Sequence, residues 1–167
     1  RPYTEQIIEY MDLHEGEAYN HETSRIKILR KTKPYLEGLL RYVPYKGNLY
    51  IKGKSVISGE IVGVSVKALT IKANGADLEL SWNKFETRQF LDIIEFYIQL
   101  KKTQIQDSPS GVANEVKKDI ADDYFRAALL SDWYSETEKL DEYMKSSLMY
   151  NPSLRPQIET FLPSISE

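Results

Sequence analysis

The chain has 167 residues, of which 41% are hydrophobic and 28% charged, a composition typical of a folded globular protein rather than a disordered one. It has no cysteine, which excludes disulfides and thiolate chemistry, and no apolar run reaches the roughly 18 to 20 residues of a membrane span. The net charge is −3, yet residues 22–72 hold 11 Lys and Arg against 3 Glu, so the rest of the chain carries −11. This asymmetry predicts either a basic surface for an anionic partner or two oppositely charged surfaces that face each other.

Targeting signals are weak in this sequence. The first twenty residues are acidic and lack an apolar stretch, so we expect no signal peptide. The compartment stays open, with the cytoplasm favoured. Because the chain begins at Arg1 without an initiator Met, we expect either a segment of a longer, multidomain protein or a processed product.

Two helical segments open the chain. Residues 4–13 begin with a Thr-x-x-Gln capping pattern and place apolar side chains at helical spacing. Residues 22–43 carry a second helical stripe that contains Pro34. Because proline lacks an amide donor and clashes with the preceding turn, Pro34 predicts a kink or the start of a separate helix.

After these helices the hydrophobic pattern becomes that of strands. Four or five short runs rich in Val, Ile, Leu and Thr follow at about 47–85. The Asn74-Gly75 pair predicts a hairpin, since a type I′ turn needs positive φ at both central residues. Four or five short strands are too few for a two-sheet sandwich. We therefore predict a small antiparallel barrel, with Gly59 and Gly63 permitting its bends.

Helices return at residues 87–103, where apolar side chains again lie on one face. Residues 104–111 have the composition of a linker. Residues 112–167 predict an antiparallel helical hairpin and a short terminal helix, with the turn near 135–137 and Asn151-Pro152 ending the second helix. The predicted domains are therefore 1–103, which holds the helices and the barrel, and 112–167, which holds the hairpin.

The stretch LYIKGKSVISGEIVGVSVKALTIKANG, residues 49–75, resembles the first motif of the Sm family of SH3-like barrels. The shared features are a strand, a Lys-Gly turn, a small-Gly-x-hydrophobic segment and a strand ending in Leu-x-Ile. The resemblance implies an α+β fold in which N-terminal helices precede a small SH3-like or Sm-like antiparallel barrel and a C-terminal helical hairpin follows it. It does not imply base-specific RNA binding, because residues 64–67 read VSVK where Sm proteins carry Asp and Asn, and WNKF replaces the Arg-Gly of the second motif.

The segments YFRAALLSDWY and LDEYMKSSLMYNP resemble the two helices of a tetratricopeptide-type hairpin. A small barrel joined to such a hairpin is similar to the C-terminal regions of large bacterial multidomain proteins, including some serine/threonine kinase chains. The residues that carry the hairpin resemblance are Ala127, Ala128, Trp133, Tyr134, Tyr143, Ser147 and Pro152.

The candidate catalytic and ligand-binding motifs in the sequence are incomplete. Gly53-Lys54-Ser55 ends like a P-loop, but residue 48 is Asn rather than Gly and β-branched residues follow instead of a helix, so we predict a turn. Adjacent carboxylates such as Asp122-Asp123 and Asp141-Glu142 diverge on a helix. We predict a non-catalytic chain with no cofactor and no metal; the ligand types in HEGEAYNH, His14, Glu15, Glu17 and His21, match no helical metal-binding spacing and favour a solvated loop.

A basic, tyrosine-bearing stretch is the remaining candidate site, because cations and aromatic rings suit phosphates and unpaired bases. Alternatively, the tyrosines pack in the core and the lysines keep strand edges soluble, or the basic region docks on the acidic helices of the same chain. The candidate residues for an anion or partner surface are Arg25, Arg30, Lys31, Lys33, Arg41, Lys46, Lys52, Lys54, Lys67, Lys72, Tyr42, Tyr45 and Tyr50.

We therefore predict a non-catalytic module for protein–protein interaction or scaffolding within a larger protein. Its partner is expected to be another protein or another domain of the same polypeptide, docked on the exposed face of the helical hairpin or on the open edge of the barrel. The alternative is binding of RNA or single-stranded DNA through residues 22–72, although an isoelectric point near 5.6 is low for a dedicated nucleic-acid binder. Trp82, Phe85 and Trp133 are assigned to the core or to packing between modules.

Overall fold

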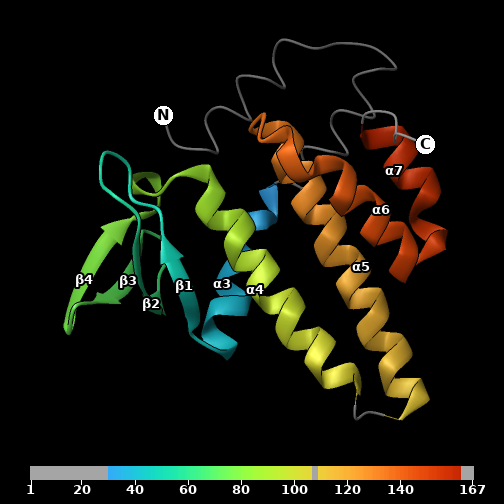
Figure 1. Cartoon of the computed structure of the whole chain (residues 1–167), viewed down its shortest axis with the longest axis horizontal. Helices are drawn as coiled ribbons and strands as arrows, with labels where there is room; N and C mark the ends of the chain where they lie inside the picture. Colours follow the sequence, from blue (N-terminus) through green and yellow to red (C-terminus); the bar gives the residue numbers. More distant parts are fainter. Residues whose placement is uncertain (1–29, 107–108, 163–167) are drawn as a thin grey trace. The chain divides into compact units, whose positions relative to one another are not determined.

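The computed structural model describes residues 30–106 and 109–162, which combine helices with one antiparallel sheet and so confirm the predicted α+β class (Figure 1). The chain divides into two compact units, Lys33–Gln99 and a second unit made of Arg1–Thr32 and Leu100–Glu167. The helix predicted at residues 4–13 and the histidine-bearing loop after it lie outside the described residues. The division predicted from sequence, with a linker at 104–111, stays a prediction.

The unit Lys33–Gln99 is built around a four-stranded sheet in which each strand pairs with the next along the chain. Figure 1 shows β4 at the edge of this sheet, beside β3. The β3–β4 hairpin turns at Asn74 and Gly75, whose φ values of 53° and 78° confirm the predicted type I′ turn. The strands are β1 (Tyr45–Leu49), β2 (Ile57–Val64), β3 (Ala68–Ala73) and β4 (Ala76–Ser81).

A bulge and a close backbone approach shape β2. Its pairing register with β3 shifts between Ile61 and Gly63, which marks a β-bulge. At Gly59, a Cβ atom would lie 2.6 Å from Cδ1 of Leu49 and 2.8 Å from the carbonyl oxygen of Lys72. Only glycine fits there, because the neighbouring strand's backbone has no room to withdraw.

A short helical turn, η1 (Trp82–Lys84), leads the chain from β4 back toward the segment that follows β1. There Ile51 forms an isolated antiparallel bridge with Phe85, flanked by two backbone hydrogen bonds of 2.8 and 2.9 Å. Phe85 is almost fully buried, at 1% exposure. This pairing holds the segment after η1 against the segment after β1.

Two helices belong to the sheet unit wholly or in part: α3 (Thr32–Tyr42) and α4 (Thr87–Gln106). Pro34 lies in the first turn of α3, where proline is tolerated, so the separate-helix alternative describes it correctly. The hydrophobic core of this unit includes Leu36, Leu40, Leu49, Ile61, Leu69, Ile71, Phe85, Ile93 and Ile94.

The second unit contains a helical hairpin of α5 (Ser110–Trp133) and α6 (Leu140–Tyr150). Between them the chain turns at Ser135, whose φ is 59°, and continues through η2 (Thr137–Lys139), in agreement with the predicted turn. The buried Ser147 hydroxyl of α6 donates to the carbonyl oxygen of Ala121 on α5 at 2.8 Å. After α6 the chain forms η3 (Pro152–Leu154) and α7 (Arg155–Phe161).

The last turns of α4 belong to this second unit and contact α5. Lys101 forms a 2.6 Å ion pair with Asp123, whose side chain is only 4% exposed. Lys102 donates to the Tyr124 hydroxyl at 2.7 Å and lies 5.3 Å from the centre of that ring. Across residues 30–106 and 109–162, no helix is long and apolar enough to cross a bilayer.

Candidate interaction surface

Gly53-Lys54-Ser55 forms a turn rather than a phosphate-binding loop. The amide of Lys54 donates to the carbonyl oxygen of Ile51 at 3.1 Å, and Gly53 has φ of 74°, the positive value that a type II turn requires at its third residue. The next regular element is strand β2 at Ile57, so the turn does not lead into a helix as a phosphate-binding loop does. The lysine side chains at 52 and 54 are exposed to solvent.

The three candidate tyrosines differ sharply in exposure. Tyr42 is 77% exposed, whereas Tyr45 and Tyr50 are 2% and 6% exposed. Tyr45 packs edge-on against Phe96 with ring centres 5.3 Å apart, and burial, reinforced by the Asp92 carboxylate, raises its pKa to about 12. The predicted surface is thus corrected for Tyr45 and Tyr50: both rings pack in the core and offer no open face for a base. The alternation in YKGNL, which places Tyr45 and Leu49 on one face, is the sequence signal for this burial.

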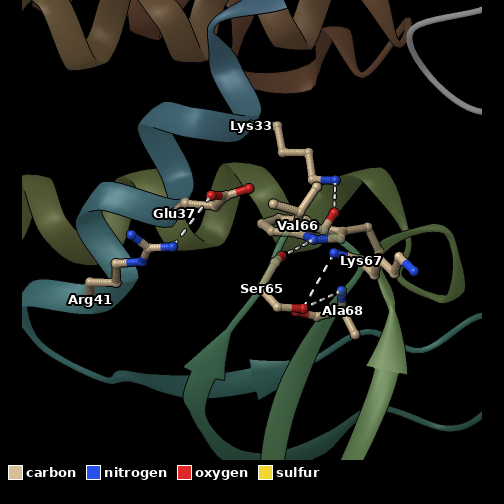
Figure 2. Close-up of polar contacts among 8 residues, drawn as sticks. Lys33, Glu37, Arg41, Ser65, Val66, Lys67 and Ala68 are labelled. Carbon is tan, nitrogen blue, oxygen red and sulfur yellow. Dashed lines mark hydrogen bonds and ion pairs between the residues drawn. The ribbon is translucent and has the colours of Figure 1, made fainter.

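Two candidate cations on α3 are held by contacts within the unit, as Figure 2 shows. Lys33 donates to the carbonyl oxygen of Val66 in the β2–β3 turn and lies 5.1 Å from the centre of the Trp82 ring. Arg41 forms an i,i+4 ion pair with Glu37 at 3.8 Å. Lys33 therefore helps to hold α3 against the turn, which reduces its freedom to bind an external anion.

The β2–β3 turn itself is internally bonded. The Ser65 hydroxyl oxygen accepts from the amides of Lys67 and Ala68 at 3.3 and 3.0 Å, and the Ser65 carbonyl accepts from the Trp82 indole at 2.9 Å. At its tip Val66 is 70% exposed. The VSVK segment is thus an ordered turn whose hydrogen-bonding groups are used locally.

Charges of opposite sign alternate across one face of the sheet, which we call the outer face. A row of directly opposed residues runs from Lys46 on β1 through Glu60 on β2 and Lys72 on β3 to Asp77 on β4. Lys46 and Glu60 form an ion pair of 3.4 Å. Because each lysine has an acid opposite it, Lys46 and Lys72 contribute little net positive charge to an anion-binding surface.

The other candidate cations of the sheet unit lie on turns rather than on α3 or in the outer-face row. Lys52, Lys54 and Lys67 are exposed on two separate turns of the sheet unit. Arg30 and Lys31 belong to the second unit, and Arg25 lies outside the described residues. The dense run of basic residues in the sequence is therefore divided among several positions.

At the edge of β1 that faces away from β2, a side chain bonds the backbone. Gln89 on α4 has 0% exposure; its amide oxygen accepts from the backbone N–H of Tyr50 at 2.8 Å, and its amide nitrogen donates to the carbonyl oxygen of Asn48 at 3.2 Å. The Tyr45 hydroxyl also donates to the Asn48 carbonyl at 2.8 Å, so side chains bond both of these backbone groups.

The opposite edge of the sheet is open within the described part of the chain. β4 pairs with β3 alone, and five of its six residues are exposed. Leu78 is 50% exposed although its cross-strand neighbour Ile71 is 2% exposed. Asp77 and Glu79 project from the outer face without an ion pair among the residues described. An accessible strand edge with an apolar residue between two acids is a candidate binding surface.

The helical hairpin offers a second, smaller candidate. Met149 on α6 and Val112 on α5 are 69% and 53% exposed. Ala127 and Tyr143, two residues of the tetratricopeptide-type resemblance, are buried within this hairpin. No group of His, Asp and Glu residues in the described ranges is arranged to hold a metal ion.

Comparison of the chain with models of protein families, with curated proteins and with solved structures found no match.

Proposed function

We propose that this chain is a non-catalytic module for protein–protein interaction or scaffolding. The observation that carries the proposal is the exposed edge of β4, where the backbone and a half-exposed Leu78 are accessible, whereas Gln89 bonds two backbone groups at the β1 edge. Extended segments of other proteins commonly bind by adding a strand to such an edge. The partner is another protein or another domain of the same polypeptide.

We also propose that the sheet belongs to the SH3-like, Sm-like class of small barrels. The four-stranded meander, the short helical turn η1 and the Ile51–Phe85 bridge support this proposal, because together they return the chain to the segment after β1. The glycine at 59 supports it too, since it permits close packing of neighbouring strands. The tetratricopeptide-type resemblance of the α5–α6 hairpin stays a proposal of the same kind.

Site-specific photocross-linking in cells of the source organism would test the interaction proposal. A photoreactive residue replaces Leu78 on β4, Met149 on α6 or, as a control of high exposure, Val66 at the β2–β3 turn. We expect a discrete cross-linked protein at Leu78 or Met149 that is absent at Val66. Equal, diffuse labelling at all three positions, or none at any of them, would contradict the proposal.

Nucleic-acid binding through residues 22–72 is the alternative function. The burial of Tyr45 and Tyr50 and the charge-balanced row weaken it, whereas the exposed Lys52 and Lys54 favour it. Titration with single-stranded RNA and DNA over a salt series separates the two functions. Tight binding at low salt that falls steeply as salt rises supports the alternative, because each phosphate contact releases counterions.

A further inference from the structure

We propose that β4 binds an extended segment of a partner protein in which cationic and apolar residues alternate, so that this segment becomes a further strand of the sheet. The proposal rests on the interaction function given above and specifies its partner. Charge, apolar exposure and the pairing rules of β-sheets each point to this chemistry.

Charge is the first argument. The outer-face row alternates Lys46, Glu60, Lys72 and Asp77, so the next strand would face Asp77 and continue the pattern with a cation. Glu79 lies two residues further along β4, on the same face, opposite the uncharged Thr70. Opposite charges that face each other across strands stabilise a sheet, so a binding strand gains from a cation at each of these two positions.

Apolar exposure is the second argument. On the other face of the sheet a cross-strand row runs through Tyr45, Ile61 and Ile71 to Leu78. The first three are between 0% and 2% exposed, but Leu78 at the edge is 50% exposed. A partner strand that places an apolar side chain opposite Leu78 would extend this row by one residue. Because successive strand residues point to opposite faces, that apolar residue lies between the two cations.

A second copy of β4 does not fit the edge. Antiparallel pairing of β4 with itself centred on Leu78 would place Asp77 opposite Glu79 twice. Centring the pair on Asp77 or on Glu79 instead would place that acid opposite its own copy. Like charges directly opposite each other destabilise a sheet, so the edge disfavours pairing with a second β4 and favours a cationic strand.

Fluorescence anisotropy with a labelled peptide of about seven residues, a typical strand length, that alternates Lys with Val and Leu tests the proposal on the full chain. We expect saturable binding that weakens as salt is raised from about 50 to about 300 mM. Glu79→Lys should weaken the binding at least about fivefold, since it places a lysine opposite a lysine of the peptide. It creates no like-charge pair within the sheet, because the neighbour of residue 79 on β3 is the uncharged Thr70. Glu115→Lys, which makes the same charge change at an exposed position of α5, should change it by less than about twofold.

Three further outcomes would overturn the proposal. Equal binding of a peptide with the same composition but its lysines grouped at one end would indicate unspecific charge attraction. Dimerisation of the free chain that competes with the peptide, measured by sedimentation, would identify a second copy as the occupant. Peptide binding that appears only when Arg25 and Lys27 are changed to Glu would identify the segment around these two residues as the occupant of the β4 edge.

The peptide experiment and the cross-linking experiment test different proposals, so a negative result in one does not decide the other. A cross-linked partner at Leu78 or Met149 without peptide binding would contradict the strand chemistry alone. The absence of any cross-linked protein at these positions would contradict the interaction function itself.

Discussion

At the scale of single residues, the Gln89 amide makes two hydrogen bonds to the backbone beside β1. It is fully buried and satisfies one backbone donor and one backbone acceptor at the edge of β1, on Tyr50 and Asn48. A buried backbone group without a partner costs about 1 to 3 kcal/mol.

We predict that Gln89→Leu lowers the free energy of unfolding by about 1 to 3 kcal/mol, because it leaves the amide of Tyr50 unpaired at nearly constant side-chain volume. The Asn48 carbonyl keeps the Tyr45 hydroxyl as a donor at 2.8 Å. Urea denaturation followed by circular dichroism measures the loss. Gln106→Ala, at an exposed position of the same helix, is the control and should change stability by less than about 0.5 kcal/mol. Equal stability of the two variants would show that Gln89 does not hold this edge.

Gly59 is a second position where the addition of one methyl group changes stability. A methyl group there would meet both the Leu49 side chain and the backbone of β3 at less than 3 Å. We predict that Gly59→Ala destabilises the protein by about 1 to 3 kcal/mol through overpacking. Gly38→Ala, at an exposed helical glycine with no atom within 4 Å, should instead stabilise it by about 0.5 to 1 kcal/mol. Thermal denaturation of both variants would show the opposite signs, and a shared sign would refute the packing argument.

At the scale of elements, the end of α4 is joined to α5 by a largely buried ion pair, Lys101 with Asp123. Removing one partner of a buried pair leaves the other charge poorly compensated. We predict that Lys101→Met destabilises the protein by about 1 to 3 kcal/mol. Lys145→Met, which removes a pair with Asp141 whose side chains are 50% and 43% exposed, should cost less than about 0.5 kcal/mol. Chemical denaturation of both variants tests the difference, and similar losses would contradict it.

The elements also show what sequence patterns can and cannot predict. The β3–β4 hairpin follows from Asn74-Gly75, and that turn alone implies that Lys72 lies opposite Asp77. The pairing of β2 with β3 could not be derived in the same way, because Gly63 indicates a bend but not which residues face each other on either side of the bulge. The complete charge row was therefore visible only in three dimensions.

The helices show a related limit. Residues 104–111 have a linker composition, yet α4 continues to Gln106 and α5 begins at Ser110. Helical ends depend on tertiary contacts as well as on local propensity, and here Lys101 and Lys102 contact α5 in the last turns of α4. The basic run was likewise a property of the linear sequence, since its residues in the sheet unit lie on a helix, on two turns and in a charge-balanced row.

At the scale of the whole molecule, buried tyrosines make stability depend on alkaline pH. Tyrosine in an unfolded chain ionises near pH 10. Burial raises the pKa of Tyr45 to about 12 and raises that of Tyr97 as well. Because the folded state keeps these protons to higher pH, their contribution is complete below pH 10 and is lost as the pH rises from 10 toward 12.

We therefore predict that the free energy of unfolding is level from about pH 7 to 9.5 and falls above about pH 10. Urea titrations at a series of pH values measure this profile, and Tyr45→Phe should reduce its slope above pH 10. Tyr42→Phe, at a tyrosine that is 77% exposed, should leave the slope unchanged. A level profile up to pH 12 would contradict the burial of these phenols.

The central claim is that the β4 edge binds a partner strand, and amide hydrogen exchange of the full chain with and without the alternating cationic peptide tests it most directly. An added strand bonds the backbone groups that point away from β3, so we predict that alternate amides of Ala76–Ser81 exchange more slowly in the complex. Unchanged exchange along β4 at saturating peptide, or protection confined to the α5–α6 hairpin, would contradict the claim.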